Sequence, residues 1–184
     1  MKKNMMNKVK GMLAVIMICF LGGCGEGEET VSVIYADYPE YDTAKSLVNE
    51  ADLVFSGTVE SMSYAMLDVR AETGIDSETG LSQSQALPYT IYKIKVDNVY
   101  KGSSNEKYIS IKCMGGEIDS IQYSVDGAEV LQEGKMYMFL AKTYENTYPS
   151  LLNVSQSIYD MNEPSAVSEE DGEITLSDIL ALFE

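Results

Sequence analysis

The chain has 184 residues, which is enough for one domain with its own hydrophobic core but too few for two full-sized domains. Apolar residues make up 45% and charged residues 23% of it, values typical of a globular protein rather than of a disordered chain. Lys and Arg total 13 against 29 Asp and Glu, and the formal charge of -16 argues against a basic face that binds nucleic acid. The absence of histidine excludes His-based catalytic triads and His-ligated metal centres.

Residues 1–23 have the layout of a secretory signal peptide. Four lysines lie within the first ten residues, the apolar run of residues 12–21 follows, and small residues come after it. The run is ten residues long, whereas a helix that crosses a bilayer needs about 20. A cleaved leader is therefore favoured over a permanent transmembrane anchor.

The apolar run ends in Leu21-Gly22-Gly23-Cys24, which closely resembles the lipobox of bacterial lipoproteins. In that family the leader is cut before the Cys, whose sulfur carries a diacylglyceryl group. The resemblance implies cleavage after residue 23, lipid attachment at Cys24, and a lipid-anchored position on the extracytoplasmic face of the cell membrane. Cys19 fits this role poorly because the large Ile18 precedes it. Two acyl chains hold a protein stably without a spanning helix.

The mature chain from Cys24 onward is more acidic than the whole. Residues 1–23 contain four Lys and no acid, so 9 basic residues remain against 29 acidic ones, a formal charge of -20. Such a charge keeps a domain soluble and away from an anionic surface, and the sharper alternative is recruitment of cations or of a basic partner. The membrane, through the diacylglyceryl anchor, is the expected partner, an envelope protein is a further candidate, and nucleic acid is not expected.

Cys113 is the thiol that remains once Cys19 is removed and Cys24 is lipidated. No internal disulfide is then possible, so the fold must depend on its hydrophobic core. A lone Cys in a strand-like segment is more often a small buried hydrophobe than a nucleophile, and a nucleophilic Cys would also need a His.

Residues 24–42 are predicted to contain the lipidated Cys, a flexible tether and a lead-in to the domain. Residues 25–30 lack apolar side chains and are typical of a spacer. The Tyr-rich residues 35–41 leave two possibilities open, docking or binding on the one hand and a lead-in strand with packed rings on the other, and we favour the strand. Asp42 or Thr43 is expected to cap a short helix, because apolar residues then recur at steps of three and four.

Residues 43–160 are predicted to form the body, with strands where the apolar period changes to two. Gly57 interrupts the first strand, where a bend or bulge is expected, and residues 61–70 can continue that strand. The polar residues 71–86 are expected to be mobile, and with residues 114–130 they are the loops where contacts with a partner are expected. The five predicted strands are residues 53–59, 89–100, 108–113, 135–141 and about 151–159.

Three blocks of the body, residues 51–59, 89–102 and 134–140, resemble recurring blocks of secreted bacterial domains of uncharacterised role. They are also distantly similar to netrin and metalloproteinase-inhibitor modules, which have an oligonucleotide/oligosaccharide-binding (OB) type of barrel. The resemblance implies a mainly β fold, a small five-stranded OB-like barrel with a short helix before the first strand. Those inhibitors are cross-linked by disulfides and place a free N-terminal Cys on the target's zinc, so their mechanism does not carry over to this chain.

Residues 161–184 are predicted to be an acidic tail with a closing hairpin and a short C-terminal helix. Asp171-Gly172 is a dipeptide typical of hairpin turns. Thr175 or Ser177 is expected to cap the helix, which runs to Phe183.

Three short segments match known functional motifs, and a chance match explains each of them better. Ser104-Asn-Glu-Lys107 matches the Ser-x-x-Lys pattern of penicillin-interacting enzymes but lies in a predicted turn and not at a helix start. Residues 76–80 alternate oxygen ligands as calcium loops do, yet they lack the Gly and Glu that an EF-hand requires, which leaves at most a weak cation site. Glu117 and Asp119 could form a glycosidase pair, but the chain has no Trp on which a sugar would stack.

These observations predict a lipid-anchored binding or accessory module that is not an enzyme, with no catalytic, cofactor-binding or metal-binding residue. Two alternatives remain. One is a structural or stress-response envelope protein without a defined ligand, which would lack a concave or apolar exposed patch. The other is a carboxylate-dependent hydrolase, which would bring two acids with opposed pKa shifts into one pocket.

Lipidation at Cys24 predicts a definite mass. Intact-mass analysis of the protein from the membrane fraction should give a chain that begins at Cys24 and carries a diacylglyceryl group, because the lipobox-like tetrapeptide follows an apolar run of signal-peptide length. A chain that retains residues 1–23, or an unmodified Cys24, would contradict this expectation.

Overall fold

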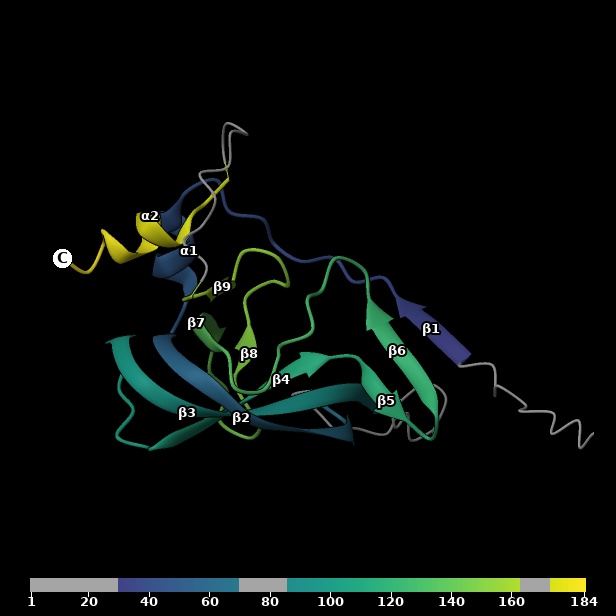
Figure 1. Ribbon diagram of the computed structural model, residues 1–184. Helices are drawn as coiled ribbons and strands as arrows, with labels where there is room; N and C mark the ends of the chain where they lie inside the picture. The colour runs from purple at the N-terminus through teal and green to yellow at the C-terminus, as the bar shows by residue number, and fades with distance from the viewer. Residues whose placement is uncertain (1–29, 70–85, 163–172) are drawn as a thin grey trace, which may run out of the picture.

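The structure, a computed structural model, describes residues 30–69, 86–162 and 173–184, and within them the protein is mainly β. The ordered elements form two sheets and a pair of short helices (Figure 1). In chain order they are β1 (Thr30–Ile34), α1 (Ala44–Glu50), β2 (Leu53–Leu67), β3 (Leu87–Lys101), β4 (Tyr108–Met114), β5 (Gly116–Ile118), β6 (Ile121–Val125), β7 (Met136–Lys142), β8 (Ser150–Leu151), β9 (Ile158–Asp160) and α2 (Leu176–Leu180).

Five strands of the larger sheet form a closed ring of pairings. Their order is β2-β3-β4-β8-β7, and the β2–β7 ladder closes the ring, while β9 pairs with β7 beside β8. The ladders of the ring are antiparallel except for β4–β8, which is parallel and pairs Lys112 with Ser150. The β4–β8 seam is therefore the weakest link of the ring.

Gly57 allows β2 to pair with two neighbours. β2 is 15 residues long and forms ladders with β3 along one edge and with β7 along the other. A Cβ at Gly57 would lie 2.6 Å from both the Lys95 carbonyl oxygen and the Ile94 side chain. The register with β3 shifts between Ser56 and Gly57, so the bend predicted at this glycine is confirmed.

The first core fills the interior of the ring. Phe55 and Phe139 face each other across the β2–β7 ladder, with ring centroids 5.0 Å apart. Burying each such ring contributes roughly 1.5–3 kcal/mol of transfer free energy. On β3 the predicted alternation is confirmed, since Tyr92 and Ile94 are buried in this core while Lys93 is exposed.

The second core lies outside the ring, between β2, β7 and the two helices, which Figure 1 shows together at one end of the molecule. Val54 and Leu140 alternate with the inward-facing rings, so they point outward and pack against Leu47 of α1 and Ile179 of α2. Thr43 and Thr175, each one of the two caps that the sequence allowed for its helix, cap the helices with complete capping boxes. The prediction that the second helix runs to Phe183 is wrong, because α2 ends at Leu180. The C-terminal helix is thus an integral part of the packing.

The smaller sheet was not predicted. Its order is β1-β6-β5, with β1 parallel to β6, and it stands at the end of the molecule opposite the helices (Figure 1). β5 and β6 form a tight hairpin in which Asp119 and Ser120 have φ values of 50° and 63°, the left-handed geometry of a two-residue turn. Residues 114–130 are therefore not simply a loop. Strands of three and five residues, paired with a segment far away in the chain, leave little periodicity to recognise.

The predicted fifth strand over residues 151–159 is wrong, because the segment is divided between β8 and β9. The cause is Asn153, whose side-chain oxygen accepts hydrogen bonds from the backbone N–H groups of Ser155 (3.2 Å) and Gln156 (2.6 Å). In this Asx-type turn, backbone N–H groups that a strand would pair with a neighbouring strand bond the Asn153 side chain instead.

The strand predicted over residues 35–41 is also absent. This segment runs as irregular chain after β1, and side chains of the turn between β8 and β9 hold it in place. The Asn153 amide nitrogen donates to the Pro39 carbonyl (2.9 Å), and the Gln156 side chain bonds both the N–H (3.0 Å) and the carbonyl (2.9 Å) of Tyr41. Polar side chains thus replace the pairing that a strand would have used. The predicted hairpin turn at residues 171–172 lies outside the described residues.

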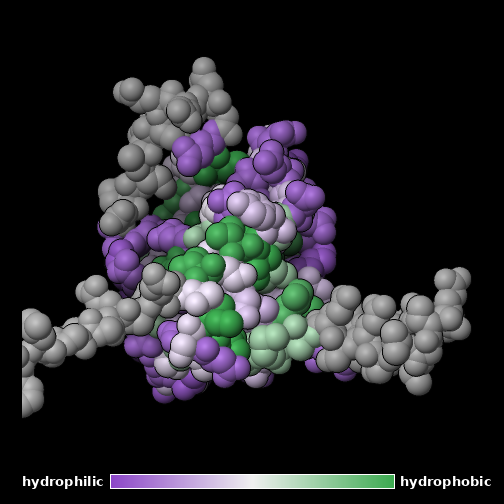
Figure 2. All heavy atoms as spheres, turned by 90° about the vertical axis from the view of Figure 1, so that its right-hand side faces the viewer, coloured by the Kyte–Doolittle hydropathy of each residue, from purple (hydrophilic) through white to green (hydrophobic). Residues whose placement is uncertain are grey.

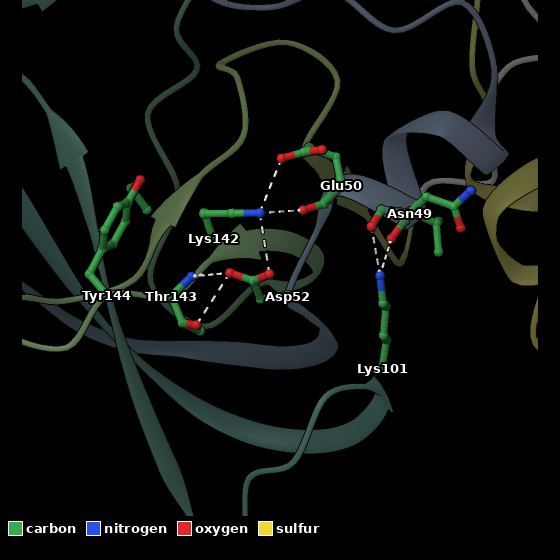
Figure 3. A network of polar contacts seen from close by, with 9 residues as sticks. Asn49, Glu50, Asp52, Lys101, Lys142, Thr143 and Tyr144 are labelled. Atoms are coloured by element: carbon green, nitrogen blue, oxygen red, sulfur yellow. Dashed lines mark hydrogen bonds and ion pairs between the residues drawn. The ribbon is translucent and has the colours of Figure 1, made fainter.

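A polar network joins α1 to the ring (Figure 3). The Lys142 ammonium lies between the carboxylates of Glu50 (3.1 Å) and Asp52 (3.3 Å), and the Thr143 N–H donates to Asp52 (3.1 Å). Lys101 reaches from the end of β3 to the last carbonyls of α1, including that of Val48 (2.7 Å), where a cation also complements the helix dipole.

Asp52 makes the stability of this junction depend on pH. The Thr143 N–H and then Lys142 hold the pKa of the Asp52 carboxyl below its usual range. A depressed folded-state pKa stabilises the protein above the unfolded-state pKa, and the contribution is lost as the pH falls through the folded-state value. Asp52→Asn should therefore lower the free energy of unfolding at neutral pH by less than about 1 kcal/mol, since the pair is exposed. The difference should shrink as the pH falls below about 4 and vanish below the folded-state pKa.

Denaturant unfolding of both proteins at neutral and acidic pH measures this difference. Glu145→Gln removes a neighbouring exposed carboxylate that lies outside the network and serves as the control. A deficit of Asp52→Asn that is the same at both pH values would contradict the assignment.

Candidate ligand-binding cavity

A cavity of about 290 Å³ lies where the ring meets the smaller sheet. This volume is at the lower end of the range for small-molecule sites, about 300–1,000 Å³. Its walls come from the start of β3, the end of β4, β6 with the chain that follows it, and the connection from β7 to β8. Six of the 13 tyrosines in the chain line it, namely Tyr38, Tyr64, Tyr89, Tyr92, Tyr123 and Tyr144.

The cavity exists because β4 leaves the ring abruptly. Gly115 and Gly116 have φ values of 98° and 124°, a backbone conformation that favours glycine. The Gly115 N–H donates to the Pro88 carbonyl (2.8 Å), and its own carbonyl accepts from the Thr90 hydroxyl (2.9 Å). A Cβ at Gly116 would lie 2.6 Å from the Tyr64 ring. The two glycines therefore turn the chain into β5 and open a space between β5–β6 and the end of the ring.

The tyrosines give the cavity apolar ring surfaces that carry hydroxyl groups. Burial raises the pKa of Tyr92 to about 12, and burial likewise raises the pKa of Tyr38 and of Tyr89. Tyr144 accepts a hydrogen bond from the Ser150 hydroxyl (3.2 Å). Rings of this kind contact apolar or aromatic groups, and their hydroxyls orient polar ones.

Lys112 of β4 also lines the cavity. The residue is 5% exposed, and its ammonium donates to the Tyr148 carbonyl and lies 4.3 Å from the centroid of the Tyr144 ring. Burial lowers its pKa from that of an ordinary lysine. No carboxylate in the described part of the chain forms an ion pair with it.

Cys113, the neighbour of Lys112, faces the core of the ring and the cavity. The residue is half-buried, and burial raises the pKa of its thiol to about 12. A thiol with so high a pKa stays protonated at neutral pH, so it is a poor nucleophile. This position agrees with the expectation of a packing role.

The other residues considered from the sequence do not converge on the cavity. The Ser104–Lys107 motif lies in the β3–β4 connection, outside any helix, and Ser104 accepts a bond from the Glu106 N–H (3.2 Å). Glu117 and Asp119 are exposed on the β5–β6 hairpin and are not among the cavity residues. Cys24, the acidic residues 76–80 and nearly all of the 71–86 loop lie outside the described residues.

Residues 114–130, predicted as a contact loop, do provide one wall of the cavity. The cavity itself was missed, because its tyrosines are spread over the chain and each fits a strand or a turn by itself. The pair Gly115-Gly116 beside a lysine in an apolar strand is the signal that could have revealed it.

Apolar side chains are also exposed around this end of the molecule. Figure 2 shows hydrophobic surface in the centre of the face that carries the smaller sheet, with hydrophilic surface around it. Val31 and Val33 alternate along β1 and are 57% and 49% exposed. A monomer seldom exposes apolar groups together without a partner or a ligand. Other exposed large apolar residues from the neighbouring elements are Tyr35, Tyr64, Met66, Leu87 and Val130.

Comparison with known proteins gives no relative, since neither a protein-family model nor a curated protein matches the chain. Among the residues that the structure describes, no helix is long and apolar enough to cross a bilayer. The same residues contain no group of three His, Cys, Asp or Glu side chains that could hold a metal ion. Inferences on function therefore depend on the cavity and on the sequence.

The high pKa of Cys113 predicts a slow reaction with thiol reagents. A rise from 9.0 to about 12 lowers the thiolate fraction near neutral pH on the order of a thousandfold. Alkylation of Cys113 by iodoacetamide, followed by peptide mass analysis, should be far slower in the native protein than after unfolding in guanidinium. Equal rates in the two states would show that the thiol is not shielded.

Proposed function

We propose that this protein is a lipid-anchored binding module on the extracytoplasmic face of the cell membrane, held by Cys24, and that it binds a small apolar or aromatic ligand without catalysis. The observation that carries the proposal is the tyrosine-lined cavity. A concave site with ring surfaces and a few polar groups is the usual form of a small-molecule site.

The body of the module is an OB-type barrel in this proposal. Support comes from the closed ring of five pairings, from the long bent β2 that pairs on both edges, and from the single-pair β4–β8 seam. A five-stranded, partly open barrel has these properties. Binding in such barrels uses the loops and one sheet face, and the cavity lies beside the seam between strand ends.

The anchor places the cavity near the membrane. Cys24 precedes Thr30, the first residue of β1, by six residues, so the connection spans at most about 20 Å. β1 belongs to the smaller sheet, which forms one side of the cavity end. A ligand from the membrane or from a membrane-bound partner would therefore be met at high local concentration.

The two alternative functions have less support. An envelope protein without a ligand would not need the cavity or the exposed apolar side chains beside it. A carboxylate-dependent hydrolase would need two convergent acids, and Glu129 is the one carboxylate among the described residues of the cavity wall.

Naphthylacetamide, a neutral aromatic probe, tests the binding function. The full-length protein in detergent should bind it saturably by calorimetry, with the detergent alone as blank. Ala128 is exposed at the wall of the cavity, so Ala128→Trp should fill the space and weaken binding by about tenfold or more while the Tm changes little.

The matched control is Ala181→Trp, an equal change at the exposed C-terminal end of α2, which should bind as the wild type does. The proposal fails if the wild type does not bind the probe, or if Ala128→Trp binds it unchanged.

A further inference from the structure

Lys112 differs from the other lysines that make polar contacts in the described structure. Lys93, Lys135 and Lys142 each lie against a carboxylate, and Lys101 lies against the carbonyl end of α1. Lys112 is the most buried of them, yet no carboxylate within residues 30–69, 86–162 or 173–184 forms an ion pair with it.

An ammonium in this position is incompletely compensated. It has three N–H donors, and the structure gives them one acceptor, the Tyr148 carbonyl, together with the face of the Tyr144 ring. Removing a charge from water is unfavourable, and a partner of opposite charge offsets part of that penalty. A methionine would fill the same space without that penalty, so the charge itself calls for an explanation.

The neighbours of Lys112 connect it to the cavity. Tyr144, whose ring lies 4.3 Å from the ammonium, and Ser150, whose hydroxyl bonds Tyr144, both line the cavity, as Lys112 does. The rings of Tyr64, Tyr92 and Tyr123 belong to the same lining. The described lining thus combines one lysine with several tyrosine rings, and Glu129 is its one carboxylate.

We propose that the cavity selects a small amphipathic anion, with an aromatic or aliphatic body against the tyrosine rings and a carboxylate or a similar group paired with Lys112. This inference rests on the proposed binding function and adds the charge of the ligand to it. Glu129, exposed at the wall of the same cavity, and the net charge of -16 both disfavour an anion, so a preference for anions has to come from the buried lysine.

A purely structural role for Lys112 makes a different prediction. Under that alternative, the bond to the Tyr148 carbonyl would fix the connection between β7 and β8, and its loss would loosen the wall for every ligand. If the role is structural, replacing Lys112 should therefore lower the Tm and weaken the binding of neutral and anionic ligands equally. If Lys112 recognises an anion, replacing it should weaken the binding of the anionic ligand alone.

Naphthylacetate and naphthylacetamide, which share a shape and differ in charge, test the inference by calorimetry on the full-length protein in detergent. The wild type should bind the anion more tightly than the amide by about tenfold, because the Lys112 ammonium is already buried in the free protein and only the anion brings it a partner of opposite charge. Lys112→Met should abolish this preference and leave amide binding nearly unchanged, and Lys112→Arg should retain the preference.

Two further variants distinguish the effect of the Lys112 charge from the effect of its hydrogen bond to Tyr148. Lys112→Gln keeps a donor for the Tyr148 carbonyl but removes the charge, so it should also lose the preference, and it decides the matter if Lys112→Met is poorly folded. Lys95→Met makes the same change in net charge at an exposed site on β3 and should keep the preference.

The outcomes distinguish the two proposals. Equal binding of both probes by the wild type, or a preference that survives in Lys112→Gln, overturns the anion inference and leaves the binding function in place. Binding of neither probe overturns the binding function and the anion inference with it.

Discussion

The close approach of β2 to β3 at Gly57 is the constraint on which the rest of the fold depends. A single strand of 15 residues has to pair with β3 on one edge and with β7 on the other, and both ladders pass through this residue. Any side chain here would meet the Lys95 carbonyl at 2.6 Å, a backbone atom that cannot move aside without breaking the ladder. The bend that glycine permits closes the ring, and the closed ring creates an inside and an outside on β2 and β7.

Both cores follow from that closure. Side chains alternate along β2, so Phe55 enters the ring while Val54 points outward, and the same division holds for Phe139 and Leu140 on β7. The outward set would be exposed on the ring of strands alone, and the two helices cover it. Because α2 is needed for this cover, the C-terminal segment belongs to the fold despite its acidic sequence. A chain with so large a negative charge and no disulfide among its described residues is held together by these two apolar clusters.

The sequence alone predicts those parts of the fold that depend on interactions between residues close together in the chain. The caps at Thr43 and Thr175, the alternation on β3 and the bend at Gly57 each depend on residues near one another in sequence, and each was predictable. The smaller sheet was not, because β1 and β6 lie about 90 residues apart and are joined in parallel, so neither strand shows its partner in its own pattern. The division of the fifth strand depends on whether one side chain, that of Asn153, bonds to its own backbone, which composition cannot reveal.

The candidate site lies where the residues do not fit the usual preferences of a β-strand. Gly115 and Gly116 end a regular strand in left-handed conformations, and Lys112 puts an ammonium into a strand whose neighbours are apolar. Each feature is unfavourable for the strand alone, since glycine weakens pairing and a buried charge lacks its hydration. All three residues line the cavity, so in the proposed function the turn opens the cavity and the lysine supplies its charge. A fold that needed only stability would be better served by a continuous β4 paired fully with β8. The proposed binding function would account for the short β4–β8 seam, the cavity beside it and an ammonium without a carboxylate partner among the described residues.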